Sequence, residues 1–210
     1  MIRAVVPVKS LGDAKSRLAE VLAPAERRDL ALAMLEDVLA ALAATPAIGR
    51  ALVVSGDAAA LALAERCGAL TLRDAAGDLN GALVQASAHL AADALLVLPG
   101  DVPLATPAEI GELVGVAAQT AVARSMDDGT NGLLLRRPAG FRFQFGVASA
   151  ARHLAEGRRD GGSAREIWLP RLARDIDDPD DLLALDALGG GTRSHALLRR
   201  IGATVRLAVV

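Results

Sequence analysis

The sequence has few aromatic residues and a single cysteine. Tyrosine is absent, aromatic side chains make up 2% of the 210 residues, and Cys67 is the one cysteine. A chain with so few aromatic rings lacks the stacking platforms that bind single-stranded nucleic acid. One thiol also excludes an internal disulfide and a cysteine-based zinc cluster. We interpret Cys67, in the segment AERCGA, as a buried structural thiol late in a helix.

An excess of charge and long apolar runs are also missing. The formal net charge of −2 provides no basic field for a polyanion, so no nucleic-acid partner is expected. No apolar run reaches the roughly 18 residues of a membrane span. The opening MIRAVVPVKS is typical of a strand and lacks the cleavage site of a signal peptide. These absences predict a cytoplasmic protein without a membrane partner.

Alternating apolar segments indicate the fold. Short runs at 2–8, 51–54 and 70–72 are apolar and typical of buried strands. Helical patterns lie between them and begin at Pro24 and at residue 57. This alternation of strand and helix predicts an α/β fold with a mostly parallel sheet.

The stretch LLVLPGDVPL, residues 95–104, places a carboxylate just after a buried strand. Asp101 follows the apolar run and Pro99-Gly100, and a helix is expected to begin at Thr106-Pro107. In open α/β sheets, ligands bind just beyond the carboxyl ends of strands. Asp101 is therefore a candidate ligand for a hard cation such as Mg²⁺, and the alternative is a carboxylate that caps a turn.

A second group of carboxylates ends another expected strand. Residues 174–178 are read as a short strand that ends in Asp175, Asp177 and Asp178, with a helix beginning at Pro179. A second carboxylate would help Asp101 to hold Mg²⁺, with substrate phosphates completing the site. The alternative is a helix cap with further acid in the first turn, which the helix dipole favours.

A basic loop follows the first strand. Residues 9–18, KSLGDAKSRL, contain Lys9, Lys15 and Arg17. Phosphates bind where such a loop leaves the sheet, although neither a Walker motif nor GxGxxG is present. The alternative is an ordinary solvated face.

The rest of the chain carries weaker signals. DDGTNG at 127–132 is typical of a hairpin turn between two strands. Ser149 is expected near a helix start, where backbone N–H groups attract anions. Asp78 or Asn80 is expected to cap a helix that starts near Gly81. Residues 158–165 are interpreted as a mobile loop.

The domain organisation predicted from these signals has two parts. Residues 1–188 form one domain, and residues 189–210 form a tail that begins with the linker GGGTR. The tail is expected to contain a short helix and a final strand. It packs on the domain or is exchanged with a second copy in a homodimer, and the sequence leaves both open.

Six stretches carry a resemblance to a known family. They are VPVKSLGDAKSRL at 6–18, LNGAL at 79–83, PGDVPL at 99–104, DGTNGLLLR at 128–136, FGVASAARH at 145–153 and DIDDPDDL at 175–182. These stretches occur in the order that is typical of the 2-phospho-L-lactate guanylyltransferase family, and the chain resembles that family across nearly all of residues 2–185. The last 25 or so residues match nothing in that pattern. The resemblance implies a nucleotidyltransferase-type three-layer α/β/α sandwich.

The resemblance also implies an activity. Family members join GTP to a phosphorylated three-carbon acid in the biosynthesis of the deazaflavin coenzyme F-420, and the product passes to a downstream transferase. A phosphate oxygen of the acid attacks the α-phosphorus of GTP and pyrophosphate leaves. Since a phosphate monoester is already mostly anionic at neutral pH, no general base is required. Positioning and charge neutralisation then carry catalysis.

Roles for particular residues follow from the resemblance. Asp101 and Asp177 match the metal-binding pair, for which Mg²⁺ is expected. Lys9, Lys15 and Arg17 match the catalytic loop that meets the triphosphate. Further matches are Asn80 and Gly100 for the nucleotide, and Thr130, Gly146 and Ser149 for the acid substrate. Two positions depart from the family pattern: Asp178 stands where many members have threonine and is expected still to cap a helix, and Asp78 replaces a more usual glycine.

The sequence is compatible with several alternatives. The acceptor is 2-phospho-L-lactate, phosphoenolpyruvate or 3-phosphoglycerate, because no motif distinguishes them. A nucleotidyltransferase for a sugar phosphate or molybdopterin is a second reading, although such enzymes usually carry a GxGxR-type first loop that is missing here. A catalytically silent nucleotide-binding domain is a third, and the presence of both Asp101 and Asp177 argues against it.

Overall fold

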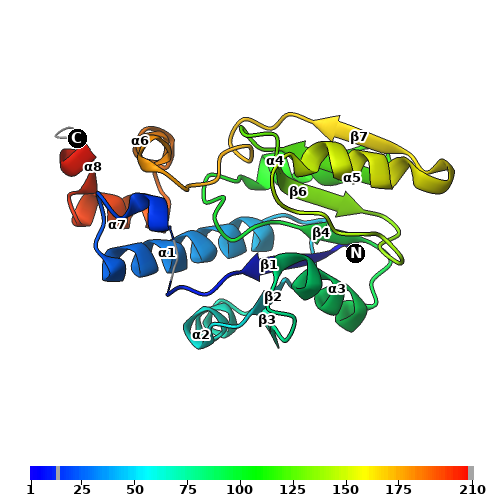
Figure 1. The fold of residues 1–210 in the computed structure, drawn as a ribbon, viewed down its shortest axis with the longest axis horizontal. Coiled ribbons are helices and arrows are strands. Elements are labelled where there is room, and N and C mark those ends of the chain that lie inside the picture. Colours follow the sequence, from blue (N-terminus) through cyan, green and yellow to red (C-terminus); the bar gives the residue numbers. More distant parts are fainter. Residues whose placement is uncertain (13–14, 208–210) are drawn as a thin grey trace.

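A seven-stranded sheet forms the centre of the computed structural model, which describes residues 1–12 and 15–207 (Figure 1). The strand order is β3-β2-β1-β4-β6-β5-β7, and only β6 runs antiparallel to its neighbours. The mostly parallel sheet predicted from the sequence is thereby confirmed. The strands are β1 Arg3–Val8, β2 Leu52–Ser55, β3 Leu70–Arg73, β4 Leu95–Val97, β5 Thr120–Arg124, β6 Thr130–Leu135 and β7 Ala164–Ile167.

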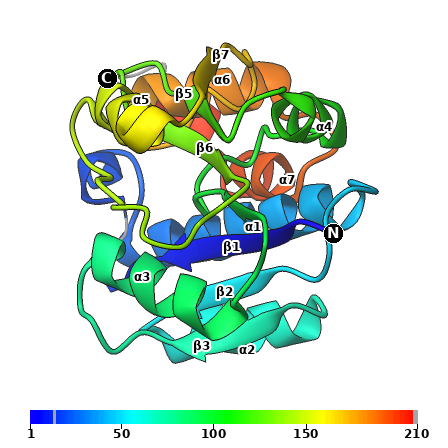
Figure 2. The same ribbon diagram turned by 90° about the vertical axis from the view of Figure 1, so that its right-hand side faces the viewer.

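Helices cover both faces of the sheet. One buried cluster joins the sheet to α1, α2 and α4, and a second joins the opposite face to α3 and α5 (Figure 2). Neighbouring strand residues divide between the two, as Val5 and Val6 do, because successive side chains point to opposite faces. The three-layer α/β/α sandwich is confirmed. The helices are α1 Pro24–Ala43, α2 Ala58–Arg66, α3 Leu79–Leu90, α4 Pro107–Gly115, α5 Ser149–Arg158, α6 Pro179–Leu188, α7 Arg193–Arg200 and α8 Ala203–Leu207, with 3-10 turns η1 Ser16–Leu18 and η2 Arg159–Gly161.

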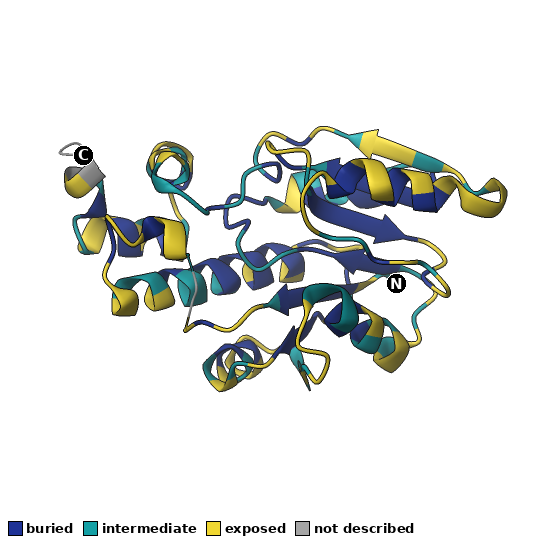
Figure 3. Cartoon of the chain, viewed as in Figure 1, coloured by how far each residue is buried: buried dark blue, intermediate teal, exposed yellow. Residues whose placement is uncertain are grey.

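Burial follows position in the sheet. The central strands β2, β4 and β6 are buried throughout, whereas the edge strand β7 is largely exposed (Figure 3). Parallel strands covered by helices on both faces read as continuous apolar runs, which is why β2 and β4 could be placed from the sequence. No helix in the described part of the chain is long and apolar enough to cross a membrane.

Two segments differ from their predicted structures. Residues 174–178 form no strand: β4 is already paired with β1 and β6, so this segment packs beyond the end of β4 instead. Residues 158–165, expected to be a mobile loop, contain η2 and the start of β7, because β5 offers an edge for a parallel partner.

Cys67 also differs from its predicted environment. The thiol was expected to be buried but is exposed. Helix α2 ends at Arg66, so Cys67 follows the last turn and lies beyond the buried stripe of Ala60, Leu63 and Ala64. Partial burial raises the pKa of the thiol, and the negative charge of Glu36 adds to the effect.

The C-terminal helices pack against α1 at one end of the molecule (Figure 1). The buried carboxylate of Asp37 on α1 accepts hydrogen bonds from the backbone N–H groups of Arg193 (2.7 Å) and Ser194 (2.9 Å). It also accepts one from the Ser194 hydroxyl at 2.6 Å. The final strand predicted in the tail is wrong as far as Leu207, since 203–207 are helical, and residues 208–210 lie outside the described residues. The domain boundary at residue 188 stays a prediction.

Candidate active site

A cleft of about 940 Å³ opens at the carboxyl ends of β1, β2 and β4. Strand order reverses here, because β1 is followed in sequence by β2 on one side and has β4 on the other. Ligands of open α/β sheets bind at such a switch point. The antiparallel strand β6 begins at the same edge and adds Thr130 and Asn131 to the lining. The volume lies at the upper end of the usual range for small-molecule sites, roughly 300–1,000 Å³.

Two carboxylates in this cleft converge on one ammonium group. Lys15 Nζ lies 2.8 Å from Asp101 Oδ2 and 2.6 Å from Asp177 Oδ1. The Lys15 side chain is only 8% exposed, whereas those of Asp101 and Asp177 are 35% and 44% exposed. Burial opposes the charge on Lys15, but the two carboxylates and their hydrogen bonds outweigh it and raise the pKa of the ammonium group.

The backbone explains why these groups meet. Asp101 follows β4, and its carbonyl oxygen accepts a hydrogen bond from Ile176 N–H at 3.0 Å. Ile176 is fully buried, so its neighbours Asp175 and Asp177, on the opposite side of the chain, reach the cleft. Asp178 caps α6 by accepting from Asp181 N–H at 3.1 Å, which confirms the capping role expected of it.

Asp175 is a site residue that the sequence reasoning did not single out. Its Oδ1 accepts a hydrogen bond from Asn131 Nδ2 at 3.1 Å. Burial raises the pKa of Asp175 to about 6; the charges of Asp101 and Asp177 act in the same direction, and the Asn131 hydrogen bond opposes them. The spacing of two acidic residues around one buried isoleucine was the available signal, since alternate residues of an extended segment share a side.

The residues expected to hold the acid substrate meet at the cleft wall. Thr130 begins β6 and Ser149 begins α5, and their hydroxyl oxygens lie 3.0 Å apart. Both residues are buried. Gly146 has φ of +130°, a backbone conformation that side-chain-bearing residues rarely adopt. The structure therefore brings Thr130, Gly146 and Ser149 together in the lining of the same cleft.

The two residues expected to bind the nucleotide, Asn80 and Gly100, differ in their position relative to the cleft. Asn80 lies outside the cleft lining: its Oδ1 accepts from Phe145 N–H at 2.8 Å and its Nδ2 donates to Phe145 O at 3.3 Å. Gly100 lines the cleft, and a Cβ there would lie 3.1 Å from Val8 Cγ2. Asp78, not Asn80, caps α3. The structure thus gives Asn80 a visible task, which is to fix the loop that carries Gly146.

Lys9 and Arg17 remain accessible to a ligand. Both are exposed and line the cleft, and within residues 1–12 and 15–207 neither has an ion pair to a carboxylate. The pKa of Asp127 is lowered mainly by the Ser125 hydroxyl, with a smaller effect from the charge of Arg17. Among the described residues, Lys15 is the one cation of the first loop that is bound to protein carboxylates.

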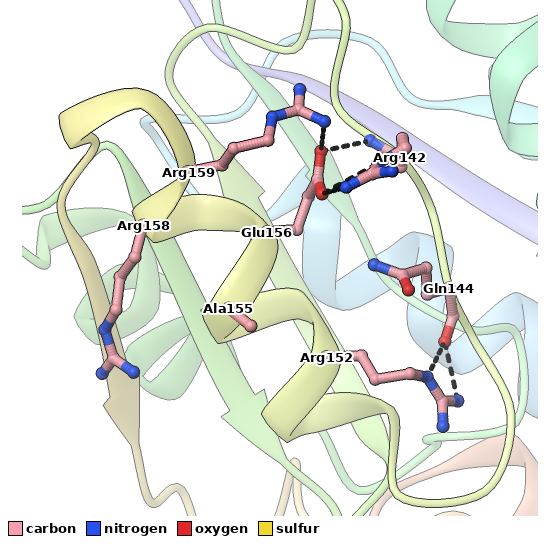
Figure 4. A pocket seen from close by; sticks show the side chains of 7 residues that line it. All are labelled: Arg142, Gln144, Arg152, Ala155, Glu156, Arg158 and Arg159. Atoms are coloured by element: carbon pink, nitrogen blue, oxygen red, sulfur yellow. Dashed lines mark hydrogen bonds and ion pairs between the residues drawn. The ribbon is translucent and has the colours of Figure 1, made fainter.

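A smaller hollow of about 360 Å³ lies on α5 and is lined largely by arginines (Figure 4). Its central carboxylate, Glu156, is 2% exposed and pairs with Arg142 at 2.9 Å and Arg159 at 2.7 Å. Arg152 donates to the Gln144 carbonyl oxygen at 3.0 Å. None of its lining residues is shared with the large cleft. These ion pairs connect α5 to Arg142 in the segment before it and to Arg159 directly after it.

Comparisons with known proteins identify the family of the chain. The family model described as "Guanylyl transferase CofC like" matches residues 2–209, so it includes the tail that the sequence resemblance left unmatched. A phosphoenolpyruvate guanylyltransferase of Roseiflexus castenholzii is 45% identical over 199 residues, covering 93% of each chain. A 2-phospho-L-lactate guanylyltransferase of Methanothermobacter thermautotrophicus is 36% identical over 208 residues, covering 97% of this chain and 92% of that protein.

A solved structure supports the fold independently. A Desulfovibrio desulfuricans G20 protein assigned as a nucleotide-diphospho-sugar transferase superposes with a TM-score of 0.76 at 18% identity, covering 98% of each chain. That identity is low, so the likeness concerns the fold alone. Family model and relatives together decide between the nucleotidyltransferase readings: the chain belongs to the CofC-like guanylyl transferase family.

Proposed function

We propose that this protein transfers the guanylyl group of GTP to a phosphorylated three-carbon acid, with phosphoenolpyruvate as the first acceptor to test. The relative of 45% identity carries the name phosphoenolpyruvate guanylyltransferase, and the 36% identical one is named for 2-phospho-L-lactate. 3-Phosphoglycerate is the third acceptor that the sequence left open. The single observation that carries the proposal is the convergence of Asp101 and Asp177 on one cation beside the Thr130–Ser149 pair.

The donor set of the cleft fits Mg²⁺. One oxygen from each of Asp101 and Asp177 already faces a shared positive charge, and carboxylate oxygens are the ligands that Mg²⁺ prefers. The described residues contain no group of three or more acidic, histidine or cysteine side chains that could enclose a metal by themselves. Protein sites for Mg²⁺ usually supply one or two carboxylates and take the remaining oxygens from substrate phosphates and water. Bound Mg²⁺ would neutralise phosphate charge and polarise the phosphorus that is attacked.

The chain's own residues would position the reactants. Lys9 and Arg17 are accessible cations and are suited to bind the triphosphate. Lys15 is suited to stabilise the charge that develops on the phosphates near Asp101. Thr130, Gly146 and Ser149 would hold the acceptor acid. A phosphate oxygen of the acceptor then attacks the α-phosphorus in line, the bond to the β-phosphate oxygen breaks, and pyrophosphate leaves. The acceptor phosphate is mostly deprotonated at neutral pH, so no side chain has to remove a proton.

A pyrophosphate-release assay tests the proposal. The protein is incubated with GTP, Mg²⁺ and each of the three acids, with ATP and CTP in parallel because no guanine contact can be read from the sequence. We expect release with GTP and at least one acid. No release with any acid, under conditions in which GTP binds, would refute the proposed function.

Asp101→Asn is the first site variant. We expect a loss of turnover of about 100-fold or more with an unchanged circular dichroism spectrum, because a neutral amide binds Mg²⁺ and Lys15 more weakly. Asp93→Asn is the matched control, since Asp93 is exposed before β4 and outside the cleft. An Asp101→Asn enzyme as active as the control would remove Asp101 from the metal site.

A role in coenzyme F-420 biosynthesis, a downstream transferase, a homodimer and a cytoplasmic location stay predictions from the sequence.

A further inference from the structure

His153 is a buried histidine in contact with the proposed acceptor site. It lies four residues after Ser149 on α5, so both side chains share a face of the helix. The imidazole is fully buried, and its ring centre lies 4.6 Å from that of Phe145 in an edge-to-face arrangement. His153 Nδ1 lies 2.9 Å from Thr130 Oγ1, and Nε2 lies 3.0 Å from the backbone nitrogen of Gln144.

The backbone contact fixes the tautomer of the ring. A backbone N–H can only donate, so Nε2 must accept the hydrogen bond from Gln144 and carries no proton. A neutral imidazole then has its proton on Nδ1, which donates to Thr130 Oγ1. A protonated ring would set Nε2–H against the Gln144 N–H. Burial, with the nearby charge of Arg152, lowers the pKa of His153 to about 4, which keeps the ring neutral at neutral pH.

The Gln144 peptide is held in place from several sides. Arg152 donates to the Gln144 carbonyl oxygen through Nε at 3.3 Å and Nη2 at 3.0 Å (Figure 4). The next residue, Phe145, is bound through both its N–H and its carbonyl by the Asn80 amide. These contacts aim the Gln144 N–H at His153, so the tautomer is set by the fold and does not depend on the ligand.

The tautomer decides what the hydroxyl pair can offer a ligand. Thr130 and Ser149 have one hydroxyl proton each, and one of these is used in the hydrogen bond between them. When His153 donates to Thr130, the other hydroxyl proton stays free. If Nδ1 accepted from Thr130 instead, both hydroxyl protons would be used and only lone pairs would face the cleft. An anionic oxygen needs the first arrangement, because lone pairs repel it.

We propose that His153 is a positioning residue that, through the Nδ1–H tautomer held by Gln144, turns the Thr130–Ser149 pair into a hydrogen-bond donor for an anionic oxygen of the acceptor acid. The inference rests on the proposed function for the identity of that acid. His153 itself does not reach the substrate; it acts through Thr130. It selects for acceptors that place a carboxylate or phosphate oxygen against the wall formed by β6 and α5.

The tautomer is measured first, without any turnover. Nitrogen-15 NMR of the full-length wild-type protein distinguishes protonated from unprotonated ring nitrogens. We expect a protonated Nδ1 and an unprotonated Nε2 at His153, unchanged between about pH 6 and 8. A protonated Nε2 at neutral pH would overturn the proposal whatever the enzyme's activity.

Kinetics test the consequence. His153→Leu should raise the KM for the acceptor about tenfold or more while the KM for GTP changes less than about twofold. His153→Asn retains an N–H donor close to the position of Nδ1 and should recover most of this loss. The asparagine variant therefore keeps the test valid even when the leucine variant folds poorly. The control, His89→Asn on the exposed side of α3, should match the wild type. Equal losses for both substrates in His153→Leu, or an acceptor KM that stays as high in His153→Asn as in His153→Leu, would indicate a purely structural role and contradict the proposal.

A double-mutant cycle with Thr130→Val separates action through Thr130 from a general effect. If His153 acts through this hydroxyl, adding His153→Asn or His153→Leu to Thr130→Val should weaken acceptor use less than about twofold further. Effects that multiply would overturn the inference. If the wild type releases no pyrophosphate, the proposed function fails. The role of His153 is then still tested by the NMR result and by calorimetric measurement of phosphoenolpyruvate binding to the same variants.

Discussion

Replacing Lys15 by methionine tests how the two carboxylates are held together. Lys15 Nζ contacts Asp101 Oδ2 at 2.8 Å and Asp177 Oδ1 at 2.6 Å. Without the ammonium group, two carboxylates of like charge share one place in the cleft, and Asp175 lies beside them. We therefore expect Lys15→Met to lower the free energy of unfolding in the absence of divalent cations.

The magnitude lies between two limits. An exposed ion pair contributes about 0–1 kcal/mol, and a buried pair that loses one partner costs about 3–5 kcal/mol. Lys15 is 8% exposed, but Asp101 and Asp177 are 35% and 44% exposed, so solvent screens part of the attraction. We expect a loss of about 2 kcal/mol, which for a chain of this size lowers Tm by about 4–8 °C.

Divalent cations should reverse this loss. If Mg²⁺ occupies the place that Lys15 leaves with a Kd of about 1 mM, then about 10 mM Mg²⁺ stabilises the variant by about 1.4 kcal/mol. The wild type should gain less, because its carboxylates already face a cation. Scanning calorimetry with and without Mg²⁺ measures both effects, and Lys9→Met, which removes an exposed lysine, is the matched control. A Lys15→Met variant with an unchanged Tm, or one that gains no more from Mg²⁺ than the wild type, would refute the reasoning.

Two further predictions concern stability. Asp37→Ala leaves the hydrogen-bonding groups of Arg193 and Ser194 without their buried acceptor and should cost about 3 kcal/mol by urea denaturation, whereas Asp29→Ala on the exposed side of α1 should cost almost nothing. For His153, with a pKa of about 4 when folded and about 6.5 when unfolded, only the unfolded state takes up a proton as the pH falls from 6.5 to 4. Wild-type stability should therefore fall by about 2.5 kcal/mol more than that of His153→Asn between pH 7.5 and 4.5; parallel losses in both proteins would show that His153 is not buried as a neutral ring.

Much of the fold could be predicted because its signals are local. The apolar runs of β1, β2 and β4, the N-terminal position of Pro24 in α1 and the capping residue Thr106 of α4 each report on a few neighbouring residues. Hydrophobic periodicity gives the type of each element in this way. The predictions were wrong where pairing with a distant segment decides the structure. Residues 174–178 form no strand because β4 is already paired on both sides, whereas β7 forms because β5 has a free edge.

Some residues of the candidate site could likewise be predicted from local signals, and others could not. A carboxylate after a buried strand indicated Asp101, and a second group of carboxylates contained Asp177. The resemblance selected Asp177 from that group and added Thr130, Gly146 and Ser149. The roles of His153 and Asn80 could not be predicted, because they depend on which backbone groups of 144–145 lie against them. The S-x-x-x-H spacing of Ser149 and His153 was visible, but an isolated histidine on a helix carries no information about its tautomer.

The sequence by itself determined the class of fold, the position of Asp101 at a strand end and, through the order of its motifs, the family. Only the tertiary structure placed Lys15 between Asp101 and Asp177, which lie 86 and 162 residues away from it along the chain. It also decided that Asp175 joins them and that a buried ring stands behind Thr130. The physical reason is that strand and helix patterns depend on neighbours within a few residues, whereas charge pairing and hydrogen-bond direction depend on groups that folding alone brings into contact.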